Sequence, residues 1–101
     1  MLSREEFVFT IGYDGSAAVV DNHGKRKFGK LSTKELAEKG LFRAAYASAV
    51  YAESPQEQRF VAEAYHKLRG QPAAEVSDAE VSGMGKLFGV YLVDVKRTIS
   101  I

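Results

Sequence analysis

The chain has no cysteine and no tryptophan, and only two of its 101 residues are proline. The lack of cysteine excludes disulfides, thiolate catalysis and cysteine–zinc sites. Its longest uncharged helical stretch, 44–52, is far shorter than the roughly 20 residues of a membrane-spanning helix. The charged start MLSREEF lacks the basic flank and apolar run of a signal peptide. We therefore expect a cytoplasmic protein without a membrane span.

The remaining composition, 46% hydrophobic and 27% charged, is too apolar and too weakly charged for a disordered chain. The length suits one core, so we expect residues 1–101 to form a single α+β domain. The net charge of +1 conceals an uneven distribution of charges. Residues 22–43 carry seven basic and two acidic side chains, whereas residues 44–80 carry six acidic and three basic ones. Such polarity can guide an acidic partner or simply form two solvated faces.

An N-terminal hairpin is the clearest local prediction. Large side chains at every second position from Phe7 to Tyr13 indicate a strand. Asp14-Gly15 then predicts a type I′ turn, because that turn needs positive φ at both central positions. The apolar segment 16–21 supplies the second strand. This register places Ile11 opposite Ala18.

Two further segments are predicted to join the hairpin. The basic segment from Lys25 to Leu31 predicts a third strand of a meander, at an edge where lysines discourage unwanted pairing. The segment from Val90 to Val95 predicts a C-terminal strand that returns to an antiparallel sheet. Residues 96–101 either extend this strand or trail as a tail.

Three Ser-x-x-Glu patterns predict helix N-termini, and they begin at Ser32, Ser54 and Ser77. The amphipathic helices predicted to follow the first two span Thr33–Ala52 and Pro55–Arg69. The third predicts a weaker helix over Asp78–Phe88, because it contains two glycines. The same pattern at Ser3 precedes a predicted strand, so we interpret it as coincidental.

The sequence contains no motif that identifies an enzyme. The segment from Gly24 to Leu31 approaches a phosphate-binding loop, but Leu31 stands where the motif needs Ser or Thr to hold magnesium. His23 and His66 lack the converging ligands that a metal site requires. We therefore predict no metal and no cofactor, and we favour a non-catalytic protein.

The middle of the first long helix suggests a function. No charge occurs between Ala44 and Ala52, and a helix that is apolar all round is normally buried all round. Either the rest of the domain covers it, or a second subunit does. On the second interpretation the protein is an interaction domain that self-associates as a homodimer. The residues predicted to form that contact are Phe42, Tyr46, Ala49 and Val50.

Two alternatives remain open. The first is a small nucleic-acid-binding protein, because cations beside an aromatic ring are typical of such surfaces. The residues concerned are Lys25, Arg26, Lys27, Phe28 and Lys30. Against it, the sequence pI of 8.0 is below the value of about 9 that marks a nucleic-acid binder. The second is a small-ligand pocket or enzyme site near Tyr46, Tyr51 and Tyr65.

Overall fold

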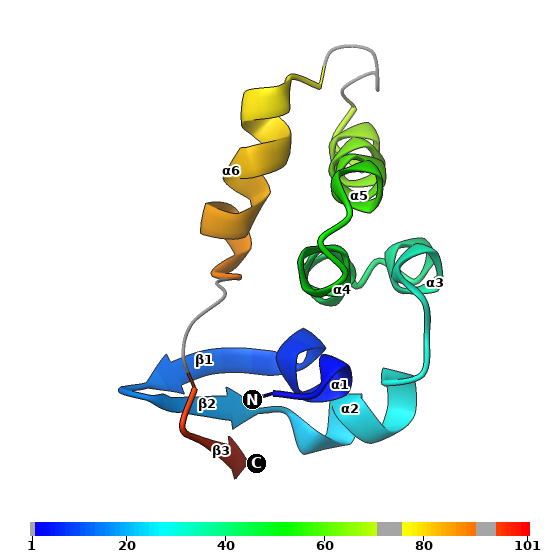
Figure 1. Ribbon diagram of the computed structural model, residues 1–101. Coiled ribbons are helices and arrows are strands. Elements are labelled where there is room, and N and C mark those ends of the chain that lie inside the picture. The colour runs from blue at the N-terminus through cyan, green and yellow to red at the C-terminus, as the bar shows by residue number, and fades with distance from the viewer. Residues whose placement is uncertain (1, 71–75, 91–94) are drawn as a thin grey trace.

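The computed structural model describes residues 2–70, 76–90 and 95–101, and these form helices beside a small sheet (Figure 1). The α+β class is as predicted. In chain order the elements are α1 (Arg4–Val8), β1 (Thr10–Asp14), β2 (Ala17–Val20), α2 (Asn22–Phe28), α3 (Thr33–Glu38), α4 (Phe42–Tyr51), α5 (Pro55–Leu68), α6 (Asp78–Phe88) and β3 (Arg97–Ser100).

The described strands form one mixed sheet in the order β1-β2-β3. The N-terminal hairpin is confirmed, with β1 antiparallel to β2. The C-terminal strand does return to the sheet, but it lies parallel to β2, so the expected antiparallel pairing is wrong. Among the described residues, five helices lie between β2 and β3, and parallel strands need a crossover connection of this kind. The strand β3 lies later than expected, and residues 91–94 of the predicted strand lie outside the described residues.

The turn lies one residue later than predicted, so the hairpin register differs by two residues, with Ala18 opposite Tyr13 and not opposite Ile11. Asp14 pairs with Ala17 and Tyr13 pairs with Ala18, so Gly15 and Ser16 form the turn. Only Gly15 adopts a positive φ there, at 60°. A turn with glycine at its first central position needs positive φ at that residue alone, as in type II′. An irregularity between Thr10 and Gly12 leaves Ile11 52% exposed.

The first part of the predicted hairpin is helical. Ser3 Oγ accepts the backbone N–H of Glu6 at 3.2 Å, and Glu6 Oε1 accepts the backbone N–H of Ser3 at 3.1 Å. This reciprocal capping box starts α1 and buries Phe7 and Val8. The interpretation of the Ser3 pattern as coincidental was therefore wrong, because the short alternation from Phe7 does not exclude a helical turn.

The basic segment predicted as a third strand forms helix α2. Asp21 caps it, with Oδ1 accepting the backbone N–H of Gly24 at 3.1 Å. Lysine and arginine are good helix formers, so the cap is enough to start a helix here. The polarity that suggested an edge strand is instead the solvent side of a short helix.

The predicted helix 33–52 is broken into α3 and α4. Gly40 has a φ of 78° and its N–H donates to Ala37 O at 3.0 Å. The N–H of Leu41 donates to Leu36 O, also at 3.0 Å. These two bonds form a Schellman ending, in which the glycine takes the left-handed conformation. The apolar stripes continue across the break, which is why periodicity alone does not reveal it.

Helices α5 and α6 begin and end within a residue of the predicted bounds. Ser54 and Ser77 each cap their helix by accepting a backbone N–H from the glutamate three residues later. The two helices are joined by ion pairs between Arg59 and Asp78, and between His66 and Glu80. Gly85 brings α6 close to α4, since a Cβ there would lie 3.6 Å from Tyr46 Cε2.

Helix α4 lies at the centre of the helical layer, and α1, α3, α5 and α6 pack against it (Figure 1). Residues 44–49 are all buried. Neighbouring helices of the same chain therefore suffice to cover the apolar helix, and its burial does not require a second subunit. The largest fully buried side chains come from α1, β2, α3, α5 and α6, and they are Val8, Val20, Leu36, Val61 and Met84.

Replacing two glycines by alanine should have opposite effects on stability. Gly40→Ala should lower the free energy of unfolding by about 1 kcal/mol, because alanine is strained at positive φ. Gly83 lies exposed inside α6 with nothing within 4 Å of an added Cβ. Gly83→Ala should therefore raise the free energy of unfolding by about 0.5–1 kcal/mol. Urea unfolding measures both, and equal shifts in the same direction would contradict the assigned helix break.

The two reciprocal capping boxes should make stability depend on pH. Hydrogen bonds from Ser3 lower the pKa of Glu6 below its ordinary value of 4.5, and bonds from Ser32 lower that of Glu35 in the same way. Each carboxyl binds its proton more weakly when folded, so its contribution is complete above pH 4.5 and is lost as the pH falls through the lower folded pKa. The double variant Glu6→Gln, Glu35→Gln should lose less stability than wild type on acidification. Identical pH slopes in urea unfolding would argue against both boxes.

Candidate nucleic-acid interface

The basic residues predicted to bind nucleic acid are divided between two sides of α2. His23, Arg26, Lys27 and Lys30 are exposed. Arg26 and Lys27 follow His23 by three and four residues on one side of α2, and Lys30 lies two residues beyond the end of that helix. We call these four residues the α2 stripe.

Lys25 and Phe28 face a different way. Phe28 is half-buried and packs against the hydrophobic core, so the structure does not present its ring as a platform for bases. Lys25 is half-buried on the side of α1, where its charge helps Ser3 to lower the pKa of Glu6. The predicted site thus keeps three of its four cations on the surface and loses its stacking aromatic ring.

The cations of the α2 stripe have no acidic partner within the described ranges. The ion pairs found there involve Arg4, Arg59 and His66, and none involves Arg26, Lys27 or Lys30. Lys27 Nζ lies 5.3 Å from the centre of the Phe28 ring, a cation–π contact that does not neutralise its charge. Because all three are exposed, their charge is available to a partner.

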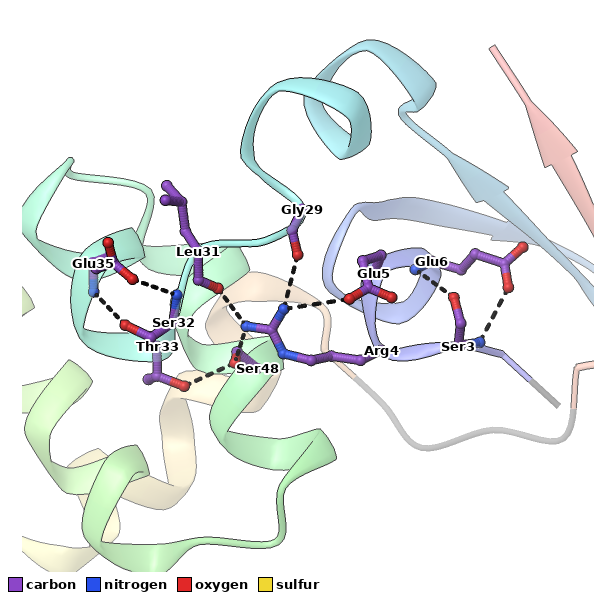
Figure 2. A network of polar contacts seen from close by, with 10 residues as sticks. All are labelled: Ser3, Arg4, Glu5, Glu6, Gly29, Leu31, Ser32, Thr33, Glu35 and Ser48. Atoms are coloured by element: carbon purple, nitrogen blue, oxygen red, sulfur yellow. Dashed lines mark hydrogen bonds and ion pairs between the residues drawn. The ribbon is translucent and has the colours of Figure 1, made fainter.

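Arg4 holds the segment that carries Lys30 (Figure 2). Its Nη1 donates to Gly29 O at 2.9 Å, and its Nη2 donates to Leu31 O at 2.6 Å. Nη2 also donates to Ser48 Oγ at 2.9 Å, and Ser48 Oγ lies 2.7 Å from Thr33 Oγ1. A single guanidinium from α1 therefore fixes both carbonyls that flank Lys30 and ties them to α4. Hydrogen bonds to a charged donor are stronger than neutral ones.

Acidic side chains gather at the other end of the molecule. Asp78 and Glu80 begin α6 beside Arg59 and Glu63 of α5, far from α2 in the elongated fold (Figure 1). The principal extents are 40 × 25 × 20 Å. Arg59 and His66 pair with these acids, and the last turn of α5 adds Lys67, so this end of the molecule is of mixed charge.

The four residues predicted for self-association have partners inside the chain. Tyr46 is 3% exposed and its hydroxyl donates to Val81 O of α6 at 2.9 Å. Ala49 is fully buried, and Val50 is partly buried against the core. The Phe42 ring lies 5.4 Å from that of Tyr65. Self-association itself stays a prediction, but these residues do not form an open surface for it.

The tyrosines of the third alternative do not converge on a common point. The Tyr46 hydroxyl donates to Val81 O, the Tyr51 hydroxyl donates to Leu2 O, and Tyr65 accepts from Arg69. The described residues contain no group of three or more His, Asp or Glu side chains placed to hold a metal ion. No helix in the described ranges is long and apolar enough to cross a membrane.

The chain matches no protein-family model, no curated protein and no solved structure. Any functional assignment must therefore be based on the geometry of the chain itself. Sequence reasoning missed Arg4, whose three acceptors lie 25 to 44 residues away in the chain. Only the tertiary fold brings them together.

Removing the Arg4 guanidinium should destabilise the fold. Arg4→Met should lower the free energy of unfolding by about 2 kcal/mol, because Gly29 O, Leu31 O and Ser48 Oγ lose a charged donor. Arg26→Met, at an exposed arginine, should change it by less than about 0.5 kcal/mol. Urea unfolding compares the two variants. Equal losses would show that Arg4 does not have this anchoring role.

Proposed function

We propose that the protein is a non-catalytic nucleic-acid-binding module whose α2 stripe contacts the phosphate backbone of a duplex. The observation that supports this proposal is a set of three exposed cations, two on α2 and Lys30 just after it, without an acidic partner in the described residues. Exposed cations attract phosphates without sequence preference, through charge and the release of counterions. The inward position of Phe28 argues for backbone contact and against base stacking.

The dimensions of the stripe suit a phosphate backbone. From His23 to Lys27 the stripe rises about 6 Å along α2 at 1.5 Å per residue, and Lys30 extends it past the helix end. One strand of B-DNA has a phosphate for about every 3.4 Å of helix axis, so the helical part of the stripe extends over about two base-pair steps. Helix α2 has only seven residues, which is short for reading bases in a groove, so we expect binding independent of sequence.

The fold provides a rigid support for these contacts. Asp21 fixes the start of α2, and Arg4 fixes the carbonyls of Gly29 and Leu31 at its end. Lys30 is thus held between two anchored residues and does not belong to a free tail.

Binding to a labelled duplex of arbitrary sequence, measured by fluorescence anisotropy, tests the proposal. With three phosphates neutralised, the logarithm of the association constant should fall with the logarithm of salt concentration with a slope of about −2.7. The triple variant Arg26→Gln, Lys27→Gln, Lys30→Gln should abolish measurable binding at physiological salt. The matched control replaces Lys34, Lys67 and Lys86, three exposed lysines elsewhere, by glutamine.

Both triple variants remove three positive charges from a chain of net charge +1, so only their position differs. The control should lose much less affinity than the α2 variant. Equal losses would mean that net charge, and not the α2 stripe, governs binding. Binding that does not change with salt, or that is as strong for polyglutamate as for the duplex, would contradict the proposal.

A further inference from the structure

A groove lies on another part of the molecule, between the α1–β1 corner and the first turn of α4. Its volume is about 400 Å³, within the range of small-ligand sites. The walls are mainly apolar, and the side chains that form them include Val8, Phe9, Ile11, Leu41, Phe42 and Phe88. One cationic side chain, Arg43, also lines it, and we call this hollow the Arg43 groove.

Arg43 is only partly neutralised by the protein. Its Nε donates to Phe88 O at 2.8 Å, and its Nη1 donates to Thr10 O. Both acceptors are neutral carbonyls, and no carboxylate in the described residues lies within ion-pair distance of Arg43. Burial lowers the pKa of Arg43, because partial removal from water disfavours its charged form. Tyr13 also interacts electrostatically with Arg43, so the groups recorded around this half-buried cation are two carbonyls and a phenol.

Asp21 is an acidic residue that also lines the groove, and one of its two carboxylate oxygens is bonded at α2. Its Oδ1 accepts the backbone N–H of Gly24, which caps that helix. The second polar feature of the groove is the start of α4, where Leu41 is the N-cap and no side chain caps the helix. The positive end of the α4 dipole and the Arg43 guanidinium therefore both belong to the same hollow, and both favour an anion.

We propose that the Arg43 groove binds an aliphatic monocarboxylic acid, with its carboxylate at Arg43 and its chain along the apolar walls. A guanidinium offers N–H donors in the planar arrangement that a carboxylate accepts. The apolar side chains remove the hydrocarbon part from water. Ile11 is 52% exposed at the irregularity of β1, so it can cover a bound chain without being needed in the core.

Titration of the ¹⁵N-labelled full chain with octanoate, followed by NMR, tests this binding. Octanoate should give saturable shifts at amides of the groove, and it should bind at least about tenfold more tightly than octanol, which has the same chain without the charge. Equal affinities would show that Arg43 does not select an anion. Shifts centred on other surfaces, or shifts that do not saturate, would overturn the proposal.

Two variants distinguish octanoate binding in the groove from nonspecific binding to apolar surface. Ile11→Glu places a negative charge at the wall and keeps the Arg43 hydrogen bonds, so it should weaken octanoate binding about tenfold. Leu68→Glu makes the same change on α5 at a side chain that is 74% exposed, and it should leave the affinity unchanged. We prefer Ile11 to Arg43 as the test position, since Arg43 also joins β1 to α6. An unchanged affinity in Ile11→Glu would contradict the site.

Discussion

The enclosure of helix α4 is the constraint on which the other elements depend. Six successive residues, from Ala44 to Ala49, are buried, so every side of this helix needs a neighbour. Four of the six are alanine, and small side chains let the surrounding helices approach closely. Tyr46 is the large exception, and it reaches α6, where Gly85 makes room for its ring. The positions of α1, α3, α5 and α6 are thus consequences of covering one apolar helix.

Two arginines connect this helical layer to the rest of the fold. Arg4 joins α1 to the α2–α3 connection and to Ser48 of α4. Arg43, at the start of α4, joins Thr10 of β1 to Phe88 at the end of α6. Each gives two backbone carbonyls a charged donor, which lowers the cost of removing them from water. Apolar packing determines which helices meet, and these arginines help to fix how the sheet sits against them.

Much of the fold could be predicted from the sequence, because capping residues and turn glycines act mainly on the backbone of nearby residues. Ser54, Ser77 and the glycines after α6 and in the hairpin acted as their residue types suggest. The failures occurred where one short pattern fits two structures. Phe7 and Val8 suit a strand or a helical turn, and the Ser3 capping box decides for the turn. The pattern around Gly40 suits a continuous helix, and tertiary packing favours a Schellman break.

The candidate sites show the same contrast between what local sequence signals reveal and what depends on the fold. The cations of the α2 stripe were found because charge is visible in a sequence, yet their grouping depends on α2 being helical. As a strand, residues 25–30 would alternate between two faces and place Lys25 and Lys27 together. As a helix they separate Lys25 from Lys27 and bring Lys27 beside His23 and Arg26. Arg43 was counted as one more cation in a basic segment. Its distinct environment arises only when α1, β1 and α6 surround it, so a long-range fold, and no local pattern, places it in an apolar groove.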